Sequence, residues 1–127
     1  MALVEIQKPA ESHIQRYETV LDSAYKILMK LGLTENESKV YMYLNINGSK
    51  KAKEISRDQK IPRTETYHLL NSLDKKGLIK QVSERITIFE GIEFEKVLDI
   101  LMSMELKRIE ELQLMRNELN ELWKVSF

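Results

Sequence analysis

The chain has 127 residues, of which 43% are hydrophobic and 31% charged, a composition typical of one globular domain with some appended helix. It has no cysteine, which excludes disulfides, thiolate nucleophiles and cysteine-based zinc sites and suits an intracellular protein. No stretch approaches the roughly 18 apolar residues that would suggest a membrane span, and the N-terminus lacks the pattern of an export signal. We therefore expect a cytoplasmic protein.

Formal charge is zero overall but unevenly distributed along the chain. Residues 47–85 contain ten Lys or Arg against five Asp or Glu, a net charge of +5. The other residues carry ten basic against fifteen acidic side chains, a net charge of −5. A basic middle flanked by acidic ends is compatible with a local surface that binds a polyanion. The alternative is a Lys-rich solvated surface.

The first two predicted elements are a flexible arm over residues 1–10, which contain Pro9, and a helix. From about Glu11 to Leu31, apolar residues recur at steps of three and four, the pattern of an amphipathic helix. Gly32 follows where a helix-terminating residue with positive φ is expected.

A second helix is predicted to begin at Thr34 and to stop near Asn47. Thr34 and Glu37 have the spacing of a capping box, in which each side chain accepts a hydrogen bond from the other residue's backbone N–H. A short helix over 51–58 follows, and after a turn a further helix is predicted from Pro62, a residue suited to the first helical position, to Lys76.

After Gly77 the hydrophobic period changes to that of strands. Residues 78–82 and 86–90 form a predicted hairpin, with its turn at 83–85. From about Glu93 to nearly Phe127 the pattern is helical again, which gives a helix about 45 Å long at 1.5 Å per residue. Because a domain of this size is roughly 30 Å across, the end of this helix is expected to project and its apolar stripe to need a partner.

This order of elements is that of a helix-turn-helix followed by a β-wing. The predicted fold class is mainly α with a small β-hairpin. We predict a flexible arm over 1–10, a winged helix-turn-helix domain over 11–92 and a long dimerisation helix over 93–127.

Residues 31–41 (LGLTENESKVY), residues 61–63 (IPR), Tyr67, Leu70 and residues 72–79 together resemble the TrmB family of archaeal transcription regulators. The resemblance covers about residues 20–100 and implies a winged-helix transcription regulator that binds DNA. Larger family members carry a C-terminal sugar- or effector-binding domain. Since this chain ends after one helix, the resemblance does not imply that it binds a sugar, and its effector stays unknown.

The chain departs from the family's pattern at three positions around the helix-turn-helix. Lys60 occupies a turn position that is often glycine, which predicts a non-glycine residue in a strained conformation. Glu65 and Thr66 stand where the family commonly has a basic and an aliphatic residue. These two departures leave the preferred DNA sequence undefined.

In a winged helix-turn-helix the second helix of the motif lies in the major groove of DNA. The residues expected to face the core are Thr66, Leu69, Leu70 and Leu73. The opposite arc of the helix then carries polar side chains that can read bases or hold phosphates. The candidate DNA-binding residues are Lys50, Lys51, Lys53, Arg63, Thr64, Tyr67, His68, Asn71, Lys75, Lys80 and Arg85. For Tyr67, half-buried packing is an equal alternative.

Cations outside that helix are candidates for phosphate contacts. Lys50, Lys51 and Lys53 are predicted at the start of the motif's first helix, where cations and backbone N–H groups can hold a phosphate. Arg85, in the wing turn, is the first candidate for a phosphate contact from the wing. His68 is expected to face the groove or solvent rather than a metal, because the other histidine is distant and no cysteine exists. No metal or cofactor is expected.

The distal half of the last helix, with help from the helix at 11–31, is predicted to pair with its twofold copy. The predicted dimer interface consists of Leu106, Ile109, Leu112, Arg116, Leu119 and Trp123. Glu105 and Arg116 lie on the same stripe. An antiparallel pairing would therefore let Glu105 of one chain face Arg116 of the other. The alternative is that the helix folds back and completes the monomer's core.

These patterns favour a sequence-specific, homodimeric regulator that binds double-stranded DNA in the nucleoid. An enzyme is not expected, since the sequence shows no phosphate loop, no nucleophile with a base and no metal-ligand spacing. Two alternatives stay open: a winged helix that docks on another protein, and a chromosomal architectural protein with little sequence preference.

Overall fold

The computed structural model describes residues 13–83 and 85–127. The predicted arm over 1–10, the predicted helix start at Glu11 and Glu84 of the wing turn lie outside the described residues. The elements are α1 (His13–Lys30), α2 (Glu35–Asn47), β1 (Lys50–Lys51), α3 (Ala52–Gln59), α4 (Arg63–Lys75), β2 (Ile79–Gln81), β3 (Ile88–Gly91) and α5 (Phe94–Ser126). The predicted fold class, mainly helical with a small sheet and a long last helix, is confirmed.

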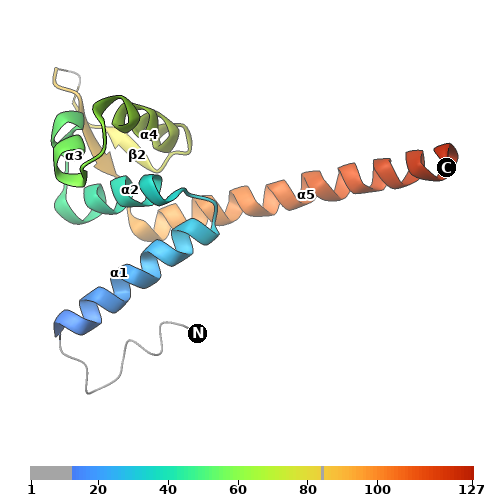
Figure 1. Ribbon diagram of the computed structural model, residues 1–127, viewed down its shortest axis with the longest axis horizontal. Coiled ribbons are helices and arrows are strands. Elements are labelled where there is room, and N and C mark those ends of the chain that lie inside the picture. The colour runs from blue at the N-terminus through green and yellow to red at the C-terminus, as the bar shows by residue number, and fades with distance from the viewer. Residues whose placement is uncertain (1–12, 84) are drawn as a thin grey trace.

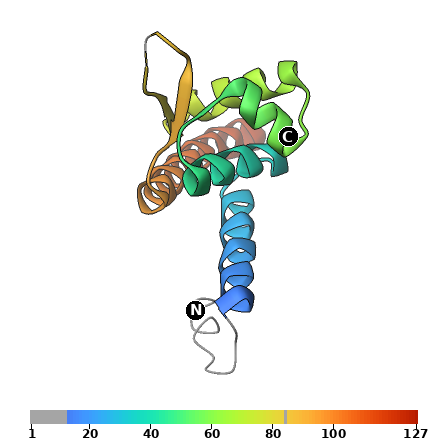
Figure 2. The same cartoon turned by 90° about the vertical axis from the view of Figure 1, so that its left-hand side faces the viewer.

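The molecule consists of a compact body and two projecting helices (Figure 1). We call the C-terminal half of α1 together with α2, α3, α4, the sheet and the first two turns of α5 the body. The rest of α5 extends far to one side, and the N-terminal half of α1 leaves the body in another direction (Figures 1 and 2). The helix-turn-helix and the wing therefore share one body, from which two helices extend into solvent.

The capping box predicted at the start of α2 is confirmed. The Thr34 hydroxyl accepts a hydrogen bond from the Glu37 backbone N–H at 3.1 Å, and a Glu37 carboxylate oxygen accepts one from the Thr34 N–H at 2.9 Å. At its other end α2 stops at Gly48, whose φ is 83°. Two local signals in the sequence therefore define both ends of this helix.

The sheet differs from the predicted two-stranded hairpin because it has a third strand. Its order is β1-β3-β2 with both pairs antiparallel, so that Lys50 pairs with Phe89 and Lys80 with Glu90. The wing strands are also shorter than predicted and begin at Ile79 and Ile88. A two-residue strand such as β1 has no periodicity of its own and exists only because β3 pairs with it.

The turn between α3 and α4 has the strained residue that the sequence predicts. Lys60 has a φ of 55°, the one non-glycine positive φ among the described residues. Pro62 precedes α4 as its N-cap rather than being its first residue, since its ψ of 145° is extended. At the other end α4 stops at Lys75, one residue earlier than predicted, and Gly77 follows with a φ of 78°.

One hydrophobic core lies under α4 and connects all parts of the body. It is formed by buried side chains that include Leu28, Val40, Tyr41, Leu44, Ile55, Leu70, Leu73, Leu78, Val97 and Leu101. The wing returns across α2 at Gly91, where an added Cβ would lie 3.2 Å from the backbone N of Asn45. A residue without a side chain is required at this close approach of two backbones.

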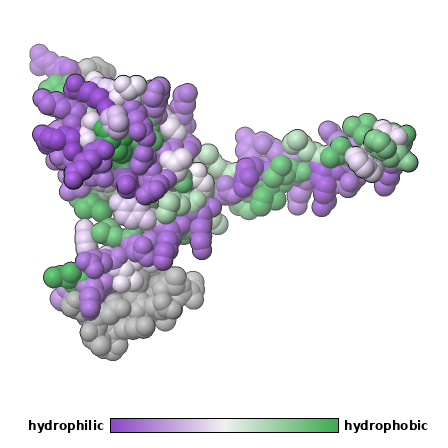
Figure 3. All heavy atoms as spheres, viewed as in Figure 1, coloured by the Kyte–Doolittle hydropathy of each residue, from purple (hydrophilic) through white to green (hydrophobic). Residues whose placement is uncertain are grey.

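Beyond the body, α5 continues as a single exposed helix. The last buried residue is Leu101, and none of residues 102–127 is buried. Apolar and polar side chains form separate areas along this projection (Figure 3). The first part of α5 thus completes the core, and the alternative in which the whole helix folds back is wrong.

Candidate nucleic-acid interface

Helix α4 presents one face to the core and an opposite polar face to solvent. Thr66, Leu70 and Leu73 are buried with at most 1% exposure. The residues predicted for groove contact are all exposed: Arg63, Thr64, Tyr67, His68, Asn71 and Lys75. The predicted inward and outward faces of this helix therefore agree with the structure.

Tyr67 was predicted to be either half-buried or free to contact DNA. Its side chain is 48% exposed, on the flank of α4 between the core face and the outermost arc. About half of Tyr67 is therefore accessible to a ligand. His68 is exposed on the outermost arc. Among the described residues, no group of three His, Cys, Asp or Glu side chains is placed to hold a metal ion.

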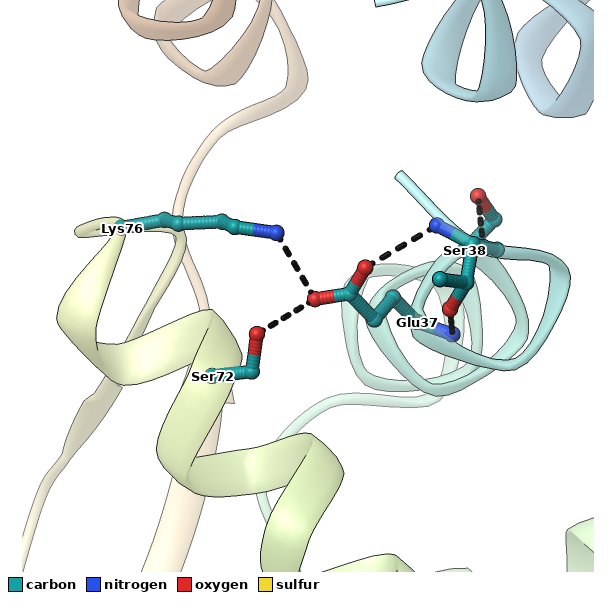
Figure 4. Close-up of polar contacts among 5 residues, drawn as sticks. Glu37, Ser38, Ser72 and Lys76 are labelled. Carbon is teal, nitrogen blue, oxygen red and sulfur yellow. Dashed lines mark hydrogen bonds and ion pairs between the residues drawn. The ribbon is translucent and has the colours of Figure 1, made fainter. Parts of the chain in front are cut away.

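The Glu37 carboxylate fixes the C-terminal end of α4 to the start of α2 (Figure 4). It accepts hydrogen bonds from the Ser72 hydroxyl at 2.6 Å and from the Lys76 ammonium at 2.9 Å. The same carboxylate closes the capping box of α2 through Thr34. With 4% exposure, Glu37 is a buried charge whose hydrogen-bond capacity is satisfied, which is the condition under which burial of a charge is tolerated.

The environment of Glu37 shifts its acidity. Burial by itself raises the pKa of the carboxyl group, but the hydrogen bonds from Lys76, Ser72 and the Thr34 backbone outweigh burial. Together with the ammonium charge of Lys76 they hold the pKa of Glu37 below its ordinary value. Glu37 is therefore ionised in the folded protein, and the attachment of α4 depends on that charge.

The N-terminal end of α4 is attached to α2 by a second polar contact. The Asn36 amide donates a hydrogen bond to a Glu65 carboxylate oxygen at 2.8 Å. The buried Thr66 hydroxyl donates to the Pro62 carbonyl at 3.0 Å. The two family departures in this helix therefore have structural roles, since Glu65 ties α4 to α2 and Thr66 satisfies its hydroxyl within its own turn.

The cations predicted to hold phosphates lie in three elements and in the wing turn. Lys50 and Lys51 form β1, where pairing with β3 keeps them extended. Lys51 is also the N-cap of α3 and Lys53 lies in its first turn, so these two lie at the start of the helix as predicted, whereas Lys50 precedes it. Lys80 in β2 lies 3.6 Å from the Glu90 carboxylate, so its charge is partly balanced. Arg85 is exposed in the wing turn.

The predicted dimer residues form an exposed stripe on the projecting part of α5. Leu106, Ile109, Leu112, Leu119 and Trp123 are each at least 49% exposed. Glu105, which was predicted to face Arg116 of a partner, forms an ion pair with Arg108 of its own helix at 2.8 Å. The Arg116 guanidinium contacts Asn117 at 3.3 Å.

Sequence reasoning missed the polar contacts that position α4. Glu37 and Lys76 are 39 residues apart, and Asn36 and Glu65 are 29 apart, so no local pattern connects them. Lys76 was predicted only as the last residue of its helix. A usable signal was the capping-box glutamate itself, because a carboxylate at that position has a second oxygen free for a distant donor.

The fold and the exposed face of α4 define the class: a winged helix-turn-helix protein with a long C-terminal helix. Residues 28–95, more than half of the chain, match the family described as the sugar-specific transcriptional regulator TrmB. The chain belongs to the TrmB family of transcriptional regulators.

A curated relative agrees with this assignment, and solved structures agree with the fold. The HTH-type sugar sensing transcriptional regulator TrmBL1 of Pyrococcus furiosus is 33% identical over 107 residues, which are 77% of this chain and 31% of TrmBL1. TrmBL2, an archaeal chromatin protein with a described novel mode of DNA binding, superposes with a TM-score of 0.70 at 23% identity, over 84% of this chain and 42% of that one. A MarR family protein from Bacillus stearothermophilus superposes with a TM-score of 0.51 at 18% identity, over 96% and 93% of the two chains.

The chain therefore spans about a third of the length of TrmBL1. In the part of the chain that the structure describes, no helix has the length and apolar content needed to cross a membrane.

Proposed function

We propose that this protein is a sequence-specific regulator that binds double-stranded DNA as a homodimer, with α4 in the major groove and the β2–β3 wing on phosphates. The observation that carries the proposal is the two-sided character of α4. Its inner face is buried and fixed at both ends through Glu65 and Glu37, and its outer face presents only exposed side chains. A rigid helix with a free polar face is what major-groove docking requires.

The outer face of α4 carries groups suited to base edges. Asn71 can pair with adenine through both of its amide atoms, the Thr64 methyl can contact a thymine methyl, and Lys75 can hold a phosphate or guanine. Arg63 lies in the first turn of α4, where the helix enters the groove. We propose that these four residues supply most of the sequence preference.

Phosphate contacts are proposed for the cations around α4. Lys51, Lys53 and Arg85 are exposed on three neighbouring segments. Lys80 is the weakest candidate, because the Glu90 carboxylate already lies 3.6 Å away. Such contacts fix the register of a protein on DNA without reading its sequence.

The homodimer is proposed from the projecting part of α5. An apolar stripe from Ile109 to Trp123 that is about half exposed or more has no partner within the described chain. Pairing with a second copy would bury it and would place two α4 helices on half-sites about 34 Å, or a multiple of that, apart. The proposed site of action is the nucleoid.

The main alternative function is DNA binding with little sequence preference. It is suggested by the likeness in fold to the chromatin protein TrmBL2. The other alternative is docking on a protein. A salt titration with random DNA separates protein docking from DNA binding. Selection of bound sites from a randomised duplex separates binding with little sequence preference from the proposal.

The test is fluorescence anisotropy with random duplex DNA at about 50 and 200 mM salt. We expect affinity to fall by about a thousandfold between the two for roughly six phosphate contacts. The variant Lys51→Glu/Arg63→Glu/Lys75→Glu should nearly abolish binding.

The control Lys30→Glu/Lys107→Glu/Lys124→Glu changes the net charge equally, on helices away from this face, and should bind nearly as wild type. No binding by the folded protein at low salt would favour protein docking. Equal loss in both variants would show that net charge, and not the α4 face, attracts the DNA.

A further inference from the structure

The short connection between the wing and α5 is fixed from both sides. Residues 92 and 93 join β3 to α5. The Ile92 backbone N–H donates a hydrogen bond to the Leu78 carbonyl, just before β2, at 2.9 Å. The Ile92 carbonyl accepts a hydrogen bond from the Tyr41 hydroxyl of α2 at 2.6 Å. Both backbone groups of this one residue are therefore tied to the body just before α5 begins.

The Tyr41 hydroxyl is oriented towards this connection by a second hydrogen bond. Its oxygen accepts a hydrogen bond at 3.1 Å from the amide of Asn45, one turn further along α2. The O–H is left to donate to the Ile92 carbonyl, and two hydrogen bonds in such a chain strengthen each other. Burial raises the pKa of Tyr41 to about 12, so the hydroxyl keeps its proton and stays a donor at neutral pH.

Apolar packing at the base of α5 specifies its direction less sharply than this hydrogen bond. Val97 and Leu101 anchor the first two turns of α5 in the core. Burial of apolar surface is not directional, whereas a hydrogen bond weakens steeply away from its preferred geometry. The bond between Tyr41 and Ile92 is therefore the contact that best defines the angle at which α5 leaves the body.

Helix α5 acts as a lever, because its exposed stripe lies far from its base (Figure 1). The helix has 33 residues, and the centre of the stripe lies about 20 residues, or about 30 Å, beyond its start at 1.5 Å per residue. A tilt of about 10° at the base would move that point by about 5 Å relative to the body. Since base pairs follow one another every 3.4 Å or so along DNA, this tilt changes the distance between two bodies by more than one base pair.

We propose that the Tyr41 hydroxyl, oriented by Asn45, is a positioning group that fixes the angle between the body and α5 and thereby the half-site spacing that the dimer accepts. The inference rests on the proposed homodimer and on DNA binding through α4. It gives a residue that is buried in the body control over which pairs of half-sites are bound.

Two hydroxyl substitutions on α2 separate this role from a general effect on stability. Tyr41→Phe removes the hydroxyl and keeps the ring. Tyr43→Phe is the matched control, because the Tyr43 hydroxyl donates to the Asp58 carboxylate at 2.5 Å and so ties α2 to α3 rather than to α5.

A second pair of substitutions acts on the orientation of the hydroxyl. Asn45→Asp replaces the donor with a carboxylate, which accepts the Tyr41 O–H and draws it away from the Ile92 carbonyl. Asn47→Asp is its control, since it adds the same charge at another exposed position of α2, where the amide donates to a carbonyl within the same helix.

The angle is measured in the dimer without DNA. Because the chain has no cysteine, Asp74→Cys at an exposed position of α4 carries one spin label per copy, and pulsed electron paramagnetic resonance measures the distance between the two bodies. We expect one narrow distance distribution in the labelled parent and in both controls. In Tyr41→Phe and Asn45→Asp the distribution should widen by about 5 Å or more, the displacement that a tilt of about 10° produces.

A DNA readout uses the site that the wild-type protein selects from a randomised duplex, without the spin label. Affinities are measured for that site and for the same site with one base pair added between its half-sites. The ratio of the two affinities should fall roughly two- to tenfold in Tyr41→Phe, the range that one hydrogen bond is worth. Affinity for a single half-site should stay unchanged, which a general loss of stability would not allow.

The outcomes distinguish this inference from the proposed homodimer. No distance between labels in the parent would contradict the homodimer itself. A dimer whose distance distribution and affinity ratio are unchanged in Tyr41→Phe would overturn the positioning role and leave the homodimer standing. Equal widening in Tyr43→Phe would also overturn it. If Tyr41→Phe does not fold, Asn45→Asp at its exposed position decides in the same way.

Discussion

The body and the projecting part of α5 contain the same kinds of apolar residue, but these are buried in the body and exposed on α5. Leu70 and Leu73 of α4 are at most 1% exposed, whereas Leu112 and Leu119 of α5 are 50% and 60% exposed. In the body, apolar side chains meet in one core and the buried charge of Glu37 is satisfied. In α5, a stripe with the same helical spacing meets solvent.

This difference separates what a single chain can stabilise from what needs a second molecule. The body buries enough apolar surface to hold α4 in place by itself. The distal half of α5 gains little from its own chain, because burial of apolar surface is the main source of stability for an amphipathic helix. Substitutions should therefore change stability in the body and association in α5.

The largest expected effect is on the stability of the body. Leu70→Ala removes a side chain that is 1% exposed and leaves a cavity under α4. We expect a loss of about 3–4 kcal/mol in the free energy of unfolding, measured by denaturant titration. The matched substitution Leu114→Ala, at a residue that is 65% exposed and off the apolar face of α5, should change it by less than about 0.5 kcal/mol. Similar losses of unfolding free energy in the two variants would contradict the claim that the body alone determines stability.

The next largest effect is on association. Leu112→Lys/Leu119→Lys places two charges on the centre of the α5 stripe and should give a folded monomer by light scattering. Affinity for a two-half-site DNA should fall by roughly a hundredfold, because linked binding of two bodies is lost.

The control Leu114→Lys/Val125→Lys adds the same charge to the opposite side of the same helix. It should leave the dimer and its affinity unchanged. A dimer that survives the first substitution would place the interface elsewhere.

A third substitution tests the wing's attachment. In Gly91→Ala the new Cβ would lie 3.2 Å from the Asn45 backbone N and 3.4 Å from its Cα, and neither backbone can yield easily. We expect a loss of about 2 kcal/mol in unfolding free energy. Thr87→Ala, at an exposed position of the same wing, should be nearly neutral. A neutral Gly91→Ala would mean that the wing can shift away from α2.

The Glu37 network gives a smaller, pH-dependent effect. Glu37→Gln removes the charge that pairs with Lys76 and should cost about 1–2 kcal/mol near pH 7. Since the folded pKa of Glu37 is lowered from its ordinary value of 4.5, the wild-type advantage is full above that pH and is lost as pH falls through the folded pKa. Denaturation curves of both proteins from pH 7 to pH 3 measure it. A difference that grows on acidification would contradict the ion pair.

The smallest effect is expected from the Glu105–Arg116 pairing between partners. Glu105→Arg should raise the dimer dissociation constant by roughly two- to fivefold, and the swap Glu105→Arg/Arg116→Glu should restore it. The pair competes with the Glu105–Arg108 contact within the helix, which keeps the effect small. Sedimentation at several concentrations measures the constants. If Glu105→Arg alone has no effect, the antiparallel register is wrong.

Most of the fold could be predicted because its signals are local. The capping box of Thr34 and Glu37 marks the start of α2, and Gly77 ends the turn after α4. The positive φ of Lys60 follows from the geometry of the turn between α3 and α4, and the periodicity of α5 predicts its length. The outward face of α4 was also predictable, since helical spacing alone separates Thr66 and Leu70 from Asn71.

What escaped prediction depends on contacts between distant segments. Lys50 and Lys51 are a strand only because β3 lies beside them. The hydrogen bonds from Ser72 and Lys76 to Glu37 span 35 and 39 residues, so no window of the sequence contains both partners. Pro62 was placed one position too far into its helix, because a residue with the φ of proline fits both the cap and the first turn.

The most direct test of the central claim, two DNA-binding bodies joined through α5, is selection of bound sites from a randomised duplex. The account predicts enrichment of an inverted repeat, with half-sites about 10 base pairs or a multiple of that apart, and its loss in Leu112→Lys/Leu119→Lys. Enrichment of a site without twofold symmetry, or the same site selected by that monomeric variant, would contradict it.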